Sequence, residues 1–240
     1  MRLQSVIRAI YPPQCVACDA HTEEDHGLCA ACWRDTQFIG GLVCDKCGTP
    51  LPGEDHGEVV QCDDCMTIAR PWDRGRAVLI YNGVGRRLVL GLKHGDRTDL
   101  AHPAAQWMAQ KIATWITEDT VIVPVPLHWV RILRRRYNQS AILAQEMGKL
   151  LDVSVCLDAL LRPKKTSALE GHSRDARFSV LAGAIVPNPK RITQLAGKRV
   201  ILVDDVMTSG ATLAASAEAA HAAGAANVSI VTLARVVKDA

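Results

Sequence analysis

Long apolar runs and aromatic side chains are both scarce in this chain of 240 residues. No apolar run approaches the roughly 18–20 residues that span a bilayer, which excludes a transmembrane protein. The N-terminal stretch MRLQSVIRAIYPPQC lacks the continuous apolar segment and small-residue cleavage site of a signal peptide. We therefore expect a cytoplasmic protein. Aromatic residues make up only 4% of the chain, so few side chains are available to stack on nucleic-acid bases.

The nine cysteines are distributed too unevenly for a disulfide framework. One of them, Cys156, lies in the apolar stretch VSVCL, where it is expected to be a buried core thiol. The other eight form four Cys-x-x-Cys pairs within the first 65 residues: Cys15 and Cys18, Cys29 and Cys32, Cys44 and Cys47, Cys62 and Cys65. Without an export signal, these pairs are better interpreted as metal ligands than as disulfides.

Two such pairs complete the tetrahedral thiolate site that Zn²⁺ prefers, so the eight cysteines predict two structural zinc ions. Combination of neighbouring pairs is expected, and interleaved pairing remains an alternative. Four thiolates leave no open position on the metal, which argues for a structural role. A redox role for one pair is the minor alternative, and it predicts a metal content well below two per chain.

Net charge divides the chain into two parts. Residues 1–72 contain 5 Lys/Arg and 11 Asp/Glu, a balance of −6, and the remainder carries +9, which together give the overall +3. Eight thiolates holding two Zn²⁺ would make the first part more acidic still. An acidic N-terminal part disfavours direct contacts with nucleic-acid phosphates there.

Composition also changes near Pro71, which predicts a zinc-ribbon module over residues 1–70 and an α/β domain over residues 71–240. In the second part, apolar strand-like runs alternate with amphipathic helical ones, the pattern of βαβ units. Strands are expected at 76–81, 120–126, 153–157, 199–203 and 227–235. Helices are expected at 99–116, 137–151 and 211–223, the last ending before Gly224. The fold class is therefore α/β, with a parallel sheet flanked by helices.

The stretch VILVDDVMTSGATL, residues 200–213, carries the main chemical signal. A buried strand delivers Asp204 and Asp205 to the carboxyl edge of the sheet, where ligands of such sheets bind. The small residues that follow allow backbone N–H groups to approach a phosphate, and Gly210 permits unusual dihedral angles. Two carboxylates would repel that phosphate, but they suit the vicinal hydroxyls of a sugar and a Mg²⁺ ion. A turn followed by a helix cap is the simpler structural interpretation, which the uninterrupted combination disfavours.

This run resembles the phosphoribosyl-pyrophosphate (PRPP) motif of type I phosphoribosyltransferases. The resemblance implies that Asp204 and Asp205 meet the ribose hydroxyls and that the loop holds the 5′-phosphate. The implied PRPP-binding residues are Asp204, Asp205, Met207, Thr208, Ser209, Gly210, Ala211 and Thr212. The stretch 123–140 follows a strand and precedes a helix, which makes it the candidate pyrophosphate loop. Its arginines, among them Arg131 and Arg135, are suited to neutralising pyrophosphate charge.

The stretch Pro-Val-Pro-Leu-His, the motif Arg-x-Tyr-Asn-Gln and the upstream Lys93-His94-Gly95 together resemble the ComF family. This competence-associated family combines a phosphoribosyltransferase-like domain with an N-terminal double zinc ribbon, and its chains often begin like Tyr11-Pro12-Pro13-Gln14-Cys15 here. The resemblance covers nearly the whole chain. It implies binding of PRPP with Mg²⁺ and the handling of incoming single-stranded DNA in natural transformation. Active phosphoribosyl transfer in nucleobase salvage or related metabolism is the alternative.

The sequence departs from the family in three places. Arg136 stands where the family usually has Gly, so a different local backbone is expected there. In the presumed hood over the reacting carbon, residues 160–185, the usual Gln is not evident, and Val180 replaces Asn. Arg177 matches the family's Arg, which makes Asp204, Asp205 and Arg177 the implied catalytic residues. These losses bear on transferase chemistry more than on PRPP binding.

The basic balance of the second part suggests where a nucleic acid would bind. If single-stranded DNA is a partner, residues 131–136 and 162–165 are expected to contribute more than the ribbon. The ribbon itself is a candidate docking site for a protein partner such as a competence helicase. The identity of an acceptor base and the oligomeric state do not follow from the sequence.

Overall fold

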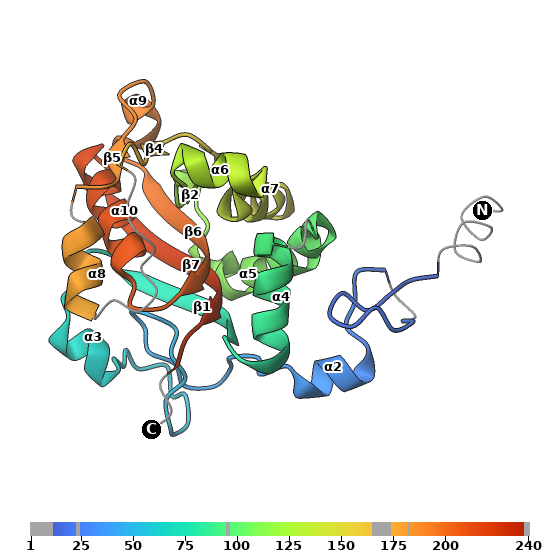
Figure 1. Ribbon diagram of the computed structural model, residues 1–240. Helices are drawn as coiled ribbons and strands as arrows, with labels where there is room; N and C mark the ends of the chain where they lie inside the picture. Colours follow the sequence, from blue (N-terminus) through green and yellow to red (C-terminus); the bar gives the residue numbers. More distant parts are fainter. Residues whose placement is uncertain (1–11, 23–24, 95–96, 165–173, 182, 238–240) are drawn as a thin grey trace.

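A computed structural model describes residues 12–22, 25–94, 97–164, 174–181 and 183–237. Its centre is a five-stranded parallel sheet with the strand order β1-β7-β6-β2-β3 (Figure 1). The strands are β1 (Arg74–Ile80), β2 (Thr120–Pro124), β3 (Ser154–Val155), β6 (Arg199–Met207) and β7 (Asn227–Arg235). All five were expected from the sequence, so the prediction of an α/β fold with a parallel sheet is confirmed.

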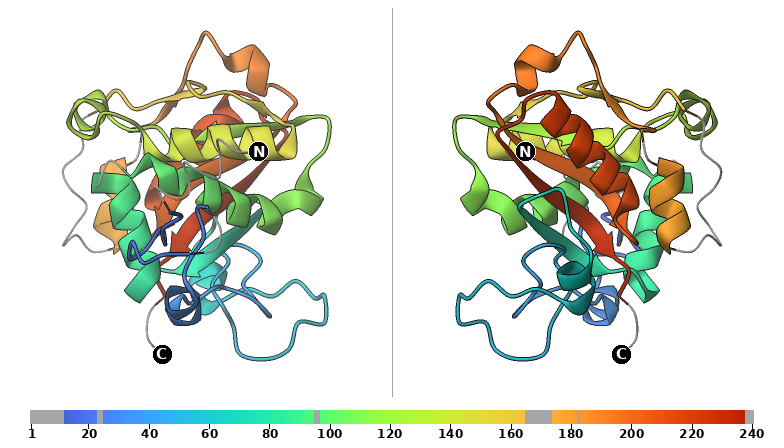
Figure 2. Two further views of the ribbon diagram at one scale, coloured as in Figure 1. Left: turned by 90° about the vertical axis from the view of Figure 1, so that its right-hand side faces the viewer. Right: turned by 90° about the vertical axis from the view of Figure 1, so that its left-hand side faces the viewer.

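Helices cover both faces of this sheet (Figure 2). The helices α8 (Arg174–Leu181) and α10 (Ala211–Ala222) lie on one face, and α4 (Gly83–His94), α5 (Ala101–Ile112) and α7 (Gln139–Leu151) on the other. Successive side chains of a strand point alternately to the two helical layers. Val200 packs with α10, whereas Ile201 packs on the α5 and α7 side. Burial on both faces explains why this strand has an almost continuous apolar sequence.

The remaining elements are short. They are the helices α2 (Ala30–Asp35), α3 (Asp63–Thr67), α6 (Trp129–Arg135) and α9 (Ile192–Leu195), the 3₁₀ turns η1 (Thr98–Leu100) and η2 (Ala113–Trp115), and an antiparallel pair of strands, β4 (Leu160–Leu161) and β5 (Val186–Pro187). Within the part of the chain that the structure describes, none of the helices has the length and apolarity needed to cross a membrane.

The strand order creates a switch point between β2 and β6. The chain leaves β2 towards β3 at one edge and leaves β6 towards β7 in the opposite direction. Diverging connections open a crevice at the carboxyl ends of two such strands. The two strands pair as far as Pro124 and Val203, so Asp204 and Asp205 follow directly at that crevice.

Two local predictions that bear on the site need correction. The strand predicted at 199–203 continues to Met207, because β7 pairs with it as far as Arg235. The stretch 123–140, interpreted as a loop, contains the helix α6. His128 caps this helix: its Nδ1 accepts a hydrogen bond from the Val130 N–H at 3.3 Å.

The N-terminal part is joined to the sheet along the outer edge of β1. The Ile39 amide donates to the Val78 carbonyl at 2.8 Å, and the Ile80 amide donates to the Gln37 carbonyl at 3.0 Å. Further along, the Gly75 amide donates to the Asp45 carbonyl at 2.7 Å. Residues 37–45 therefore cover an edge that would otherwise be free to pair with another chain.

Candidate functional site

The acid pair lies within β6 and faces residues from two helices on the same side of the sheet. The Asp205 side chain is buried, and its Oδ1 forms an ion pair with Lys93 Nζ at 3.2 Å, in the last turn of α4. Asp204 Oδ1 accepts hydrogen bonds from Ser140 Oγ and from the Asp205 amide, both at 2.9 Å. Both carboxylates are therefore held in place before any ligand arrives.

Burial raises the pKa of Asp204 to about 7, and repulsion from the neighbouring Asp205 adds to this effect. Lys93 and the Ser140 hydroxyl oppose the increase, because both stabilise the ionised carboxylate. Burial and the neighbouring carboxylate therefore favour the neutral form of Asp204 in the absence of a ligand. A hydroxyl donor or a divalent cation at this position would favour the ionised form.

The small residues after β6 form a turn that leads into α10. Gly210 is the N-cap of this helix and has a φ of +83°, a left-handed conformation that favours glycine. A recess of about 30 Å³ is lined by Asp204 and residues 206–213. The first amides of an α-helix have no intrahelical partner, so the start of α10 offers N–H donors to this recess.

Cationic side chains approach the acid pair from the α6 side. Arg162 is only 6% exposed. Burial lowers the pKa of Arg162 to about 10, and nearby Arg131 adds to this, whereas Asp204 opposes it. Burial and the adjacent Arg135 also lower the pKa of Arg131. Positive groups crowded together at partial burial are suited to a polyanion such as pyrophosphate.

The Tyr-Asn-Gln motif forms hydrogen bonds with α4, β2 and α7 around this site. Tyr137 Oη donates to the Leu92 carbonyl at 2.7 Å, and Asn138 Nδ2 donates to the Val125 carbonyl at 3.0 Å. Asn138 also caps α7, since its Oδ1 accepts from the Ser140 amide at 3.1 Å. The motif thus connects the end of α4 and the end of β2, and it sets the positions of Lys93 and Ser140.

The arginines named from the sequence have different surroundings. Arg135 ends α6, and its Nη1 donates to Gln139 Oε1 at 3.3 Å. Arg136 follows with a φ of +68°, the left-handed conformation that favours glycine. Arg177 lies in α8, which packs against α10. Of the presumed hood, residues 165–173 and 182 lie outside the described residues.

Two groups of four cysteines lie apart from this acid pair. They combine as sequential neighbours: Cys15, Cys18, Cys29 and Cys32 in the first cluster, and Cys44, Cys47, Cys62 and Cys65 in the second. In each cluster, the four Sγ atoms lie within 4.8 Å of one another. Two of these separations, Cys18 to Cys29 and Cys47 to Cys62, are 3.7 Å. A tetrahedron with Zn–S bonds of about 2.3 Å has edges of about 3.8 Å, so both clusters fit zinc.

The sequence did not reveal several residues at the acid pair and its loop. Lys93 was visible only within a motif, and Ser140 had no local signal. Arg162 was assigned to a DNA-contacting surface but is turned inwards. Two further buried arginines, Arg70 and Arg235, bind carbonyl groups of the loop after β6. No periodicity identifies them, because their function depends on residues far away in the chain.

Comparison with known proteins agrees with this geometry. Residues 99–239, which contain the acid pair and the loop, match the Phosphoribosyl transferase domain family. The chain belongs to the phosphoribosyl transferase domain family. Residues 6–66 match the Double zinc ribbon domain family.

The relatives of this phosphoribosyl transferase domain protein confirm its resemblance to the ComF family. It is 29% identical to the DNA utilization protein YhgH of Salmonella typhimurium, over 93% of this chain and 97% of that protein. It is 27% identical to Competence protein F of Haemophilus influenzae, over 83% of this chain and 87% of that protein. Among solved structures, a hypoxanthine phosphoribosyltransferase from Staphylococcus aureus matches with 15% identity and a TM-score of 0.35, over 58% of this chain and 68% of that one.

Proposed function

We propose that this protein binds PRPP together with Mg²⁺ at the carboxyl ends of β2 and β6. Asp204 and Asp205 bind the ribose hydroxyls and approach the metal, and Met207, Thr208, Ser209, Gly210, Ala211 and Thr212 hold the 5′-phosphate. Arg135 and its basic neighbours neutralise the pyrophosphate. In this proposal residues 71–240 form the ligand-binding domain and residues 1–70 the zinc-ribbon module.

One observation carries this proposal. Two adjacent carboxylates and a loop rich in N–H donors lie beside each other at the switch point of the sheet. An anion alone would be repelled by the carboxylates, and a cation alone would not need the loop. A ligand that carries both a diol and a phosphate satisfies both parts, and the buried charge of Arg162 provides for a second anionic group.

The biological role that we propose is the cytoplasmic handling of single-stranded DNA. Relatives named DNA utilization protein and Competence protein F support it. The DNA would contact α6 and the basic residues that follow it, since Trp129 and Leu133 are exposed there. The acidic ribbon would then be free to dock a protein partner such as a helicase.

Phosphoribosyl transfer to a nucleobase is the second candidate. The match to the Phosphoribosyl transferase domain family favours it, and the match includes Arg177. Asp204, Asp205 and Arg177 would then be the catalytic residues. Adjacent carboxylates stabilise the positive charge that develops on the ribose carbon as pyrophosphate leaves. Release of pyrophosphate from PRPP and Mg²⁺ with a panel of bases would distinguish transfer from binding alone.

Calorimetric titration with PRPP and Mg²⁺ tests the binding proposal. We expect wild-type protein to bind, and we expect Asp204→Asn/Asp205→Asn to lose at least tenfold in affinity because both the diol and the metal lose their acceptors. Glu118→Gln/Asp119→Asn is the matched control: it neutralises two adjacent exposed acids before β2, at the opposite end of the sheet. Absence of wild-type binding, or equal losses in both double variants, would refute the proposal.

A further inference from the structure

Two buried arginines donate hydrogen bonds to backbone carbonyls of the loop after β6. Arg235 Nη1 donates to the carbonyls of Met207 at 3.2 Å and Thr208 at 2.5 Å. Arg70 Nη1 donates to the next carbonyl, that of Ser209, at 2.8 Å. Three consecutive carbonyls of the loop therefore point towards guanidinium groups.

This arrangement fixes the direction of the loop's amides. In a planar trans peptide, the carbonyl of one residue and the N–H of the next point in opposite directions. Carbonyls of Met207, Thr208 and Ser209 that face the arginines therefore turn the N–H groups of the following three residues away from them. Successive amides on one side of a turn form an anion-binding concavity. The arginines thus orient the donors that the proposed 5′-phosphate needs.

Both guanidinium groups need compensating charge. Arg70 is 9% exposed and Arg235 is 4% exposed. In each, Nε has no hydrogen-bond partner among the described residues, and no ion pair found in that part of the chain includes either side chain. An uncompensated buried charge is strongly unfavourable.

The second cysteine cluster lies beside both arginines. Cys44, Cys47 and Cys65 pack in the same apolar cluster as Met207 at the end of β6. Trp72, whose ring Arg70 approaches, belongs to the same apolar cluster. Arg235 reaches the same end of β6 through its hydrogen bond to the Met207 carbonyl. Four thiolates around one Zn²⁺ carry a net charge of about −2, which two guanidinium groups balance.

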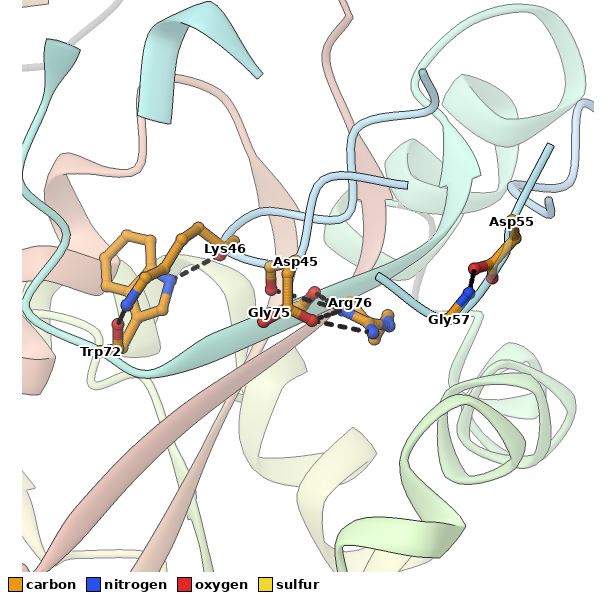
Figure 3. A network of polar contacts seen from close by, with 7 residues as sticks. All are labelled: Asp45, Lys46, Asp55, Gly57, Trp72, Gly75 and Arg76. Atoms are coloured by element: carbon orange, nitrogen blue, oxygen red, sulfur yellow. Dashed lines mark hydrogen bonds and ion pairs between the residues drawn. The ribbon is translucent and has the colours of Figure 1, made fainter. Parts of the chain in front are cut away.

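Trp72 completes the connection between the cluster and the loop. Its Nε1 donates to the Lys46 carbonyl at 2.6 Å, and Lys46 Nζ donates to the Trp72 carbonyl at 2.8 Å, so the Cys44–Cys47 turn is tied to this ring (Figure 3). Arg70 lies 5.4 Å from the ring centroid. A Cβ on Gly210 would meet Arg70 Nη1 at 2.8 Å and the Trp72 ring at 3.3 Å, so both side chains pack directly against the loop.

The first cysteine cluster lies elsewhere, away from the loop after β6. Cys15 and Cys32 pack on the other face of the sheet, in the cluster that contains Leu88 of α4. Its polar connection to the α/β part runs through Arg97, which binds Asp19 and Asp99. The two metal sites are therefore unequal with respect to the loop after β6.

We propose that Arg70 and Arg235 are positioning residues that couple the second cysteine cluster to the loop at residues 207–210. Zinc in the second cluster then sets the ligand affinity of that loop, whereas zinc in the first cluster does not. This inference rests on the proposed binding of PRPP for its functional consequence. The coupling itself rests only on the contacts described above.

A matched pair of cysteine variants tests this asymmetry in the full-length protein. Cys29 and Cys62 are both partly exposed, and each is the N-cap of a short helix in its cluster. We expect Cys62→Ser to weaken PRPP binding at least tenfold and to accelerate hydrogen exchange of the peptide spanning residues 204–213. Cys29→Ser should stay within twofold of wild type in both measurements, although zinc analysis should show one ion lost from each variant. Equal effects of the two variants on loop exchange would overturn the inference.

Arginine variants separate positioning from folding. Arg70→Gln and Arg235→Gln should accelerate exchange in residues 204–213 and weaken PRPP binding at least fivefold, with both zinc ions retained. Arg70→Lys, which keeps the charge and an N–H donor group on a flexible stem, should recover part of the affinity. Unchanged loop exchange in both Gln variants, with zinc and melting temperature also unchanged, would contradict the proposal. If wild-type protein does not bind PRPP, the proposed function fails, and hydrogen exchange still decides whether the coupling exists.

Discussion

At the scale of single residues, Gly210 is subject to two separate constraints. Its φ of +83° disfavours any L side chain, and a Cβ there would lie 2.6 Å from Met207 Cε as well as close to Arg70. Gly197 has a similar φ of +71°, but a Cβ there would meet nothing within 4 Å. The two glycines therefore allow backbone strain to be separated from packing.

Substitution of these two glycines by alanine should have different costs. Gly197→Ala should lower the free energy of unfolding by about 1 kcal/mol, the cost of a left-handed alanine. Gly210→Ala should lower it by about 2–4 kcal/mol, because overpacking adds about 1–3 kcal/mol, and it should also weaken PRPP binding. Urea unfolding measures both changes. Equal losses would show that the loop can move away from its arginines at little cost.

Arg136 adopts a left-handed backbone conformation, which glycine adopts more easily than arginine. Its φ of +68°, directly after the last turn of α6, lies in the left-handed region that favours glycine. A side chain in this region costs roughly 1–2 kcal/mol, only part of which the lower unfolded-state entropy of a non-glycine residue offsets. The arginine therefore adds strain at a position whose backbone conformation favours glycine.

Arg136→Gly should consequently stabilise the protein by about 0.5–1 kcal/mol. Leu133→Gly is the control, because Leu133 is an exposed residue within α6, where glycine should cost about 1 kcal/mol. Chemical unfolding of both variants gives the comparison. Destabilisation by Arg136→Gly would indicate that the arginine side chain makes a contact worth more than the strain.

At the scale of elements, α6 presents apolar side chains to solvent beside basic ones. Trp129 is 62% exposed and Leu133 is 72% exposed, and the spacing of four residues places them on one face of the helix. The exposed Arg136 follows at the end of the helix. An exposed indole beside positive charge is the combination with which proteins bind single-stranded nucleic acid without sequence preference.

Trp129→Ala should therefore weaken binding of single-stranded DNA by about 5- to 150-fold, since stacking of one base contributes about 1–3 kcal/mol. The salt dependence should change little, because no charge is lost. Trp33→Ala is the matched control, as Trp33 is 55% exposed in the acidic N-terminal part. Fluorescence anisotropy with a labelled oligonucleotide measures both affinities. A larger loss in Trp33→Ala would place the DNA surface on the ribbon.

At the scale of the whole molecule, the cysteine clusters form part of the core of the α/β fold. Cys15 and Cys32 pack under one face of the sheet, and Cys44 and Cys47 under the other. The ion pair between Arg76 and Asp45, at 3.1 Å, adds a polar connection between β1 and the second cluster. The acidic N-terminal part and the basic remainder are thus joined by packing as well as by charge.

Removal of zinc should for this reason destabilise the whole protein. A chelator under reducing conditions should lower the unfolding midpoint of the α/β domain by more than about 10 °C. Zinc binding contributes several kcal/mol to folding, and each kcal/mol shifts the midpoint by roughly 2–4 °C at this size. Far-UV circular dichroism records the transition, and Zn²⁺ but not Mg²⁺ should restore it. An unchanged midpoint would mean that the ribbon unfolds independently.

The sequence by itself determined the local features whose physical causes are local. The apolar runs predicted the five strands, and the four Cys-x-x-Cys pairs predicted the two cysteine clusters. Cys156 was expected in the core and is buried. Gly224 follows the C-cap of α10 with a φ of +85°, as its position in the sequence predicted. Each of these depends on neighbouring residues or on burial of one short segment.

The tertiary structure decided everything that depends on distant residues meeting. The length of β6 depends on its pairing with β7, and the surroundings of Asp204 and Asp205 depend on Ser140 and Lys93 from two different helices. Arg70 and the loop carbonyl of Ser209, which form a hydrogen bond, are separated by 139 positions in the chain. Burial of a charge is determined by the whole fold, and no local pattern in a sequence records which distant group will balance it.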